Sequence, residues 1–231
     1  MWEKVKYDKW EILMKSSEDD CDGPNHSHSD FIHFTVKYDD EIILIDSGRA
    51  SYDPNCLHNE AYLPEFHNSV RIEGLGYKPD KKRLFTSDYS RNNSSIDALS
   101  QNDSLIINLR TDGFNRIDKD ICFIRKIRIK AGSIIIEDVS GSRNNLEIEH
   151  YFHFKKSKVN IDSNNEINVT AGNKTILFMP ETKQSPLSKK LIKKGINYYA
   201  RNYGVLENKY VYYGKNKINM NKPIVHELRV K

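Results

Sequence analysis

Long apolar segments are missing from this sequence of 231 residues. No run approaches the roughly 18 apolar residues that a membrane-spanning helix needs, so we expect no membrane partner. Residues 1–15 lack the apolar core and the small-residue cleavage site of a signal peptide. The sequence as it stands therefore carries no recognisable export signal, and it leaves the cellular location unknown.

Cysteine is scarce, with Cys21, Cys56 and Cys122 and no Cys-x-x-Cys pair. An odd number at these spacings supports neither a disulfide framework nor a zinc finger. The excess of positive charge is also small, because 36 lysine and arginine residues face 32 acidic residues, for a net charge of +4. Nucleic-acid-binding domains concentrate more basic charge than this. We therefore expect no nucleic-acid partner, whereas an acidic polysaccharide is compatible with the charge.

Helical periodicity is confined to residues 188–200, where Leu191, Ile192, Ile196 and Tyr199 can form one apolar stripe. Elsewhere, short runs of alternating apolar residues predict β-strands. These runs are residues 11–14, 31–36, 42–45, 70–72, 105–109, 121–129, 134–139, 146–154, 167–169, 175–179 and 224–230. Many short strands separated by turn residues predict an all-β fold, a large antiparallel β-sandwich with one short helix near the C-terminus. We expect residues 1–231 to form a single domain.

A polar stretch ahead of the second predicted strand combines two histidines with an acid at alternate positions, His26, His28 and Asp30. Residues two apart in an extended chain point to the same face, so these three side chains can line one surface. Imidazole and carboxylate groups together are typical ligands of zinc and related divalent ions.

Asp46 follows the third predicted strand, and Asp39-Asp40 would turn that strand back into a hairpin with the strand before it. A strict two-residue turn places Asp46 opposite His33, whereas a bulge or strand curvature would favour His28. The spacing alone leaves both arrangements open.

His67 stands at the entry to the predicted strand 70–72 and is followed by Asn68. Together with the upstream histidines and Asp46, it completes a three-point candidate site for a metal ion. The alternative is that these are structural polar side chains whose hydrogen bonds are satisfied within the protein.

The order of these motifs resembles that of the heparinase II/III-like polysaccharide lyases, in their C-terminal β-sandwich domain. The similarity begins with an HxHxD motif at His26, a DxG motif at Asp46, Tyr52 a few residues later, and an HN pair at His67. It continues in an Arg-bearing strand and a strand ending in Asp within residues 121–138, a His-bearing strand at 149–154, and a Tyr-Gly pair within 200–204. The resemblance thus covers nearly all of the chain.

The resemblance implies that His28, Asp46 and His67 are the metal ligands, usually for zinc. Two imidazoles and one carboxylate also favour zinc, although Ca²⁺ and Mn²⁺ are possible. In the family, the metal organises loops beside the substrate cleft and need not contact the sugar.

Three further residues receive roles from the resemblance. His26 corresponds to the cleft-facing histidine, which implies a catalytic part in proton transfer or in neutralising the substrate carboxylate. Asp30 is expected to orient a ligand histidine from behind. Asn68 is expected to anchor the loop beside His67.

The activity implied by the resemblance is cleavage of uronic-acid-containing polysaccharides, such as glycosaminoglycans, by β-elimination. A base removes the proton next to the uronate carboxylate, the carboxylate charge is neutralised, and an acid protonates the departing oxygen. In the family, the catalytic tyrosine comes from an N-terminal helical toroid domain, which we expect to be absent from these residues. Family members are typically periplasmic or attached to the cell envelope.

Three functions are compatible with the sequence. The first is half of a lyase site, incomplete without a toroid domain or partner chain. The second is a non-catalytic module that binds acidic glycans and keeps the metal as a structural staple. The third is a purely structural β-sandwich. The first function predicts cleavage when a toroid is added, and the second predicts glycan binding without cleavage. The third predicts that folding does not depend on a metal.

Overall fold

The computed structural model describes residues 2–15, 28–77, 94–164, 166–181 and 195–231. Regular structure in these residues is almost entirely β, with two short 3₁₀ turns, η1 (Pro64–Phe66) and η3 (Lys156–Lys158). The strand pairs described are all antiparallel. The predicted all-β class is confirmed.

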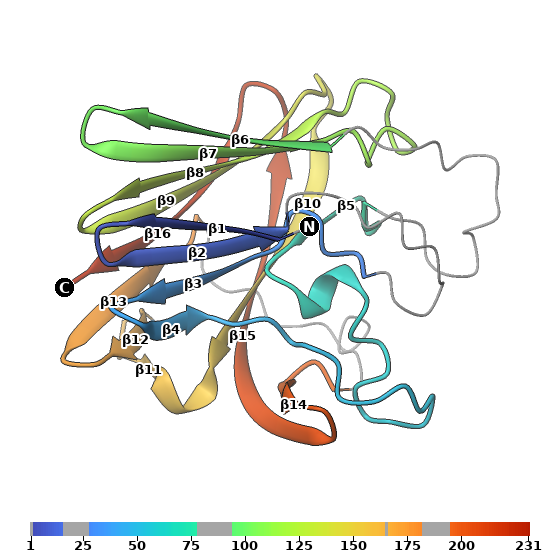
Figure 1. Cartoon of the computed structure of the whole chain (residues 1–231). Coiled ribbons are helices and arrows are strands. Elements are labelled where there is room, and N and C mark those ends of the chain that lie inside the picture. Colours follow the sequence, from blue (N-terminus) through green and yellow to red (C-terminus); the bar gives the residue numbers. More distant parts are fainter. Residues whose placement is uncertain (1, 16–27, 78–93, 165, 182–194) are drawn as a thin grey trace.

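The strands form three sheets (Figure 1). The first contains, in spatial order, β1 (Trp2–Tyr7), β2 (Trp10–Lys15), β3 (Phe34–Tyr38) and β4 (Glu41–Leu44). The second contains β14 (Tyr198–Asn202), β15 (Val205–Ile218), β10 (Leu146–Lys155) and β5 (Val70–Ile72). The third contains β11 (Val159–Ile161), β12 (Ile167–Ala171), β13 (Lys174–Met179), β16 (Ile224–Val230), β9 (Ser133–Ser140), β8 (Phe123–Lys130), β7 (Ser104–Thr111) and β6 (Ser94–Gln101).

The main hydrophobic core lies between the eight-stranded sheet and the other two. It contains fully buried residues from each of them, among which are Phe34 on β3, Phe152 on β10 and Ile127 on β8. The two smaller sheets also touch directly, because the N–H of Ile45 donates to the carbonyl oxygen of His153 at 2.9 Å. This layering confirms the predicted β-sandwich.

Strand β8 illustrates how the sequence pattern forms this layering. Ile127 and Ile129 are buried, whereas Lys126 and Arg128 face outward. The predicted polar face of this strand is therefore confirmed. Arg125 breaks the pattern, since it shares the inward face and is fully buried, which places a guanidinium group in the interior.

The predicted β3–β4 hairpin is also present. Asp39 and Asp40 both have positive φ angles, 52° and 63°, as a two-residue type I′ turn requires. The pairing register then shifts between Lys37 and Val36, which is a β-bulge. A bulge was expected to favour His28 as the neighbour of Asp46, but Asp46 lies beside His33 despite the bulge, with its Oδ1 3.5 Å from Nε2 of His33.

The predicted C-terminal helix is wrong over the residues that the structure describes. Residues 188–194 lie outside them, and residues 195–200 form a turn that leads into β14. Gly195 has φ +84°, and a side chain there would collide with the carbonyl oxygen of Leu57. The segment is instead held by tertiary contacts, such as the hydrogen bond from Ala200 N to Ser47 O at 2.7 Å. Among the described residues, no helix is long and apolar enough to cross a membrane.

Candidate metal centre

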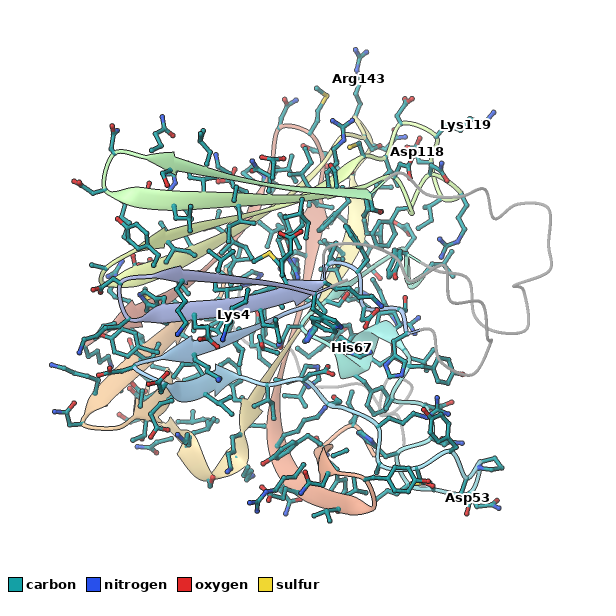
Figure 2. All side chains as sticks on the ribbon, in the orientation of Figure 1. Lys4, Asp53, His67, Asp118, Lys119 and Arg143 are labelled. Atoms are coloured by element: carbon teal, nitrogen blue, oxygen red, sulfur yellow. The ribbon has the colours of Figure 1, made fainter. Side chains whose placement is uncertain are left out.

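Three chain segments meet where β3 begins. They are the turn before β3, the residues that follow β4, and the residues between η1 and β5. Figure 2 places His67 beside η1 at this end of the sandwich. The η1 turn forms because Pro64 supplies a fixed φ at its first position, and the N–H of His67 closes the turn onto Pro64 O at 3.0 Å.

The buried side chain of Asn68 ties these segments together. Its Nδ2 donates to the carbonyl oxygens of Phe34 at 2.7 Å and Ile45 at 2.9 Å. Its Oδ1 accepts the N–H of His153 at 2.8 Å. One amide thus satisfies main-chain groups of three different elements, which fixes the position of the neighbouring His67.

The guanidinium of Arg125 holds the same backbone from the opposite sheet. Its Nη1 donates to the carbonyl oxygens of Ile32 at 3.0 Å and Asn68 at 2.9 Å. Its other two nitrogens form a bidentate ion pair with Asp138 at 2.7 and 2.8 Å. His150 adds a third bond to Asp138 at 2.9 Å. A buried charge network, in which Arg125 and Asp138 are paired, therefore supports the two segments that carry His33 and His67.

Asp46, His33 and His67 form a compact group. Oδ1 of Asp46 lies 2.7 Å from Nδ1 of His67 and 3.5 Å from Nε2 of His33. One ligating atom from each residue lies within 4.8 Å of the other two. Both histidines are buried, but the Asp46 side chain is 32% exposed, so the group opens to the surface on the side of its carboxylate.

The protonation of His33 is fixed by a backbone contact. The N–H of Asn68 donates to Nδ1 of His33 at 2.9 Å, so Nδ1 must offer its lone pair. Burial lowers the pKa of His33 to about 4, although the Asp46 carboxylate opposes this. The ring is therefore neutral near pH 7, and its single proton resides on Nε2, which faces Asp46.

His67 and Asp46 are strongly coupled. Burial opposes the charged form of each, but their mutual attraction and hydrogen bond prevail. As a result, the pKa of Asp46 falls well below its ordinary value and the pKa of His67 rises. Nε2 of His67 is buried and has no hydrogen-bond partner in the described structure. Because Nδ1 donates its proton to the Asp46 carboxylate, Nε2 is the nitrogen through which a neutral His67 ring can bind a cation.

His28 lies next to this group, with its ring centroid 5.4 Å from that of His67. It is partly buried, and burial followed by the charge of His67 lowers the pKa of His28 to about 4. Its imidazole is thus neutral near pH 7 with a free lone pair for a metal. Arg49, near enough to His28 to lower that pKa slightly, stacks its guanidinium over the Tyr52 ring at 4.2 Å.

The other predicted site residues lie as follows. The Asp30 carboxylate forms a buried ion pair with Lys15 at 3.0 Å. Asn68 bonds the loops as described above. His26 lies outside the described residues. The sequence patterns pointed to His33 only through the hairpin register. They gave no role to Arg125, because its bonds to Ile32 and Asn68 join residues 93 and 57 positions apart in the sequence.

The fold and this group together define an antiparallel β-sandwich domain with a His–Asp–His cluster whose two histidines are buried. Within that class, the family described as "Heparinase II/III-like, C-terminal" matches residues 2–205, and the chain belongs to this family. The predicted family is confirmed. No curated protein matches the sequence.

Solved structures show the same fold. The heparan sulfate lyase HepC mutant from Pedobacter heparinus has a TM-score of 0.69 at 11% identity, covering 99% of this chain and 34% of that one. Heparinase III has a TM-score of 0.66 at 12% identity, with coverage of 99% and 34%. The chain spans about a third of the length of these proteins.

Proposed function

We propose that this chain is the C-terminal domain of a polysaccharide lyase that cleaves uronic-acid-containing polysaccharides by β-elimination. The lyase requires an N-terminal helical toroid domain, or a partner chain, for the rest of its active site. The observation that carries this proposal is the Asp46–His67 pair, flanked by His28 and His33, in a domain of the heparinase II/III-like C-terminal family. The solved lyases of similar fold are about three times as long.

The donor set of this cluster fits a divalent metal ion, and we assign His28, Asp46 and His67 as its ligands. Asp46 is held as a carboxylate, and His28 is held neutral. His33 is the less suitable ligand, because its free nitrogen carries a proton while the other nitrogen accepts the N–H of Asn68. Two imidazoles and one carboxylate favour zinc over Ca²⁺ or Mn²⁺. A bound zinc ion would supply a positive charge that fixes these loops together.

The residues around the ligands have positioning roles in this proposal. His33 turns its Nε2–H towards Asp46 and so restricts the orientation of the carboxylate. Asp30, buried against Lys15, holds the segment that carries His28. Asn68 and its five hydrogen bonds set the position of His67. His26 is assigned to the substrate cleft, in proton transfer or in neutralising the uronate carboxylate.

The metal assignment is tested by elemental mass spectrometry of the purified chain and two histidine variants. We expect about one zinc per chain, lost in His28→Ala and retained in His33→Asn, whose side-chain oxygen can accept the same Asn68 N–H. Equal loss in both variants, with both folded by circular dichroism, would make His33 a ligand. Absence of zinc, calcium and manganese from all three proteins would overturn the assignment.

The lyase assignment is tested by joining the chain to a toroid domain encoded immediately upstream of it. The ultraviolet absorbance of the unsaturated uronate product is recorded with heparan-like, alginate-like and capsular acidic glycans. We expect cleavage of at least one of these by the fusion and not by the chain alone. Binding of the glycans without cleavage by the fusion would favour the alternative, an acidic-glycan-binding module with a structural metal.

A further inference from the structure

A pocket of about 520 Å³ lies beside β15, where this strand runs past the end of its neighbour β10. The last pair in that ladder joins Lys155 to Lys209. The pocket is lined mainly by two lysines, two asparagines and two tyrosines: Lys156, Lys209, Asn197, Asn208, Tyr198 and Tyr210. No acidic residue is among its lining residues, so its charge is positive.

Lys209 is the unusual member of this lining. Only 2% of the residue is exposed, and its Nζ donates to the hydroxyl of Ser47. No acidic side chain of the described residues lies within ion-pair distance of this amine, which is instead 5.5 Å from the centroid of the Phe66 ring. A buried ammonium without a carboxylate is costly, and burial lowers the pKa of Lys209 to about 7.

Such a charge would be stabilised by an anion that enters the pocket, since a charge-assisted contact is stronger than a neutral one. Lys156, which is exposed at the pocket and forms no ion pair in the described structure, adds a second positive charge. Asn197 and Asn208 offer amide donors and acceptors of the kind that bind hydroxyl groups. Tyrosine rings supply flat apolar surface beside these polar groups.

We propose that this pocket binds an acidic sugar residue, with Lys156 and Lys209 neutralising its carboxylate or sulfate group and the two asparagines contacting its hydroxyls. The choice of a sugar over another anion rests on the proposed function. The need for an anion rests on the pocket alone. Ser47 links this pocket to the metal centre, because it contacts Lys209 and directly follows Asp46.

The test follows the side-chain amide signals of Asn197 and Asn208 by NMR while ligand is added to the metal-free chain. D-glucuronate and D-glucose 6-sulfate are compared with D-glucose and with inorganic sulfate. We expect saturable shifts with one or both acidic sugars. Glucose and inorganic sulfate should bind at least about tenfold more weakly than the acidic sugar that binds. The exposed Asn55 serves as the reference amide that does not shift.

Two lysine variants and one matched control complete the experiment. Lys209→Met and Lys156→Gln are each expected to weaken binding of the acidic sugar about tenfold. Lys217→Gln, an exposed lysine farther along β15, should leave it unchanged. The proposal would be overturned if glucose bound as tightly as the acidic sugars. It would also be overturned if Lys156→Gln and a folded Lys209→Met both bound the acidic sugar as tightly as the parent. Equal binding of inorganic sulfate would overturn its sugar part. Because this experiment uses the metal-free chain, its result does not depend on whether the metal assignment is correct.

Discussion

The carboxamide oxygen of Asn68 accepts the backbone N–H of His153 at 2.8 Å. This bond joins the loop after η1 to the C-terminal part of β10, 85 positions away. The carboxamide nitrogen of Asn68 bonds two further carbonyl oxygens, those of Phe34 and Ile45. The group of His33, Asp46 and His67 is therefore held by one buried amide in addition to its strands.

Replacing Asn68 with Ala should destabilise the protein strongly. The change leaves two carbonyl oxygens and one N–H buried without partners, and each such group costs about 1–3 kcal/mol. We expect the free energy of unfolding in urea to fall by about 3 kcal/mol or more. The exposed Asn55→Ala serves as the control and should change it by less than about 0.5 kcal/mol. A loss in Asn68→Ala no larger than that of the control would contradict the structural role.

Replacing Arg125 with Met should also destabilise the protein, because it leaves the Asp138 carboxylate buried without its bidentate partner. Breaking a buried pair from one side costs about 3–5 kcal/mol. The double variant Arg125→Met with Asp138→Asn should cost less than the sum of the two single changes, since the uncompensated charge is gone. Arg110→Met on β7, an exposed position, is the matched control. Additive losses would show that the two side chains are not coupled.

Binding of zinc should raise the stability of the folded chain. Because the unfolded chain does not hold the three ligands together, free zinc at about one hundred times its Kd should add about 2.7 kcal/mol to the free energy of unfolding. The chain stripped with a chelator loses this gain, and zinc restores it. Asp46→Asn, which keeps the shape of the side chain without its charge, should show little or no gain. A gain of equal size in Asp46→Asn would remove Asp46 from the site.

The sequence patterns predicted those elements whose signal is local. The turn at Asp39-Asp40 and the alternation around Ile127 and Ile129 depend on neighbouring residues, and both are present. The residues of the DxG and HN motifs also meet, although 21 positions separate Asp46 from His67 and the strands β4 and β5 beside them lie in different sheets. The β-bulge between Val36 and Lys37 could not be chosen from the spacing, since it depends on packing against the other sheets.

Two long strands carry too little alternation to be found. Strand β6 is an edge strand, mostly exposed, and its polar sequence resembles a loop. Strand β15 is the longest, but lysines, asparagines and Gly214 interrupt its apolar pattern. Gly214 is needed there because a side chain would collide with the hydroxyl of Tyr212. Within residues 195–200, the helix expected near the C-terminus is replaced by a turn and the start of β14, and Gly195 in that turn adopts a positive φ.

Lys209 gives the protein a predictable dependence of stability on pH. Its pKa of about 7 in the folded chain lies below the ordinary 10.5, with burial as the main cause. Between these values, the unfolded chain binds a proton that the folded chain releases, so stability rises as pH increases through this range. Below about pH 7 the ammonium must be buried, and the full penalty applies, at most about 4–5 kcal/mol.

Replacing Lys209 with Met should remove this penalty while it also removes the bond to Ser47. We expect the variant to be more stable than the parent by about 2–3 kcal/mol near pH 6, and by little or nothing near pH 10. Urea denaturation at the two pH values measures both differences. Lys217→Met on the exposed face is the control and should behave like the parent at both. If Lys209→Met were less stable than the parent near pH 6, the amine of Lys209 would have a partner that offsets the cost of its burial. The charge of this amine would then not be available to an anion in the pocket.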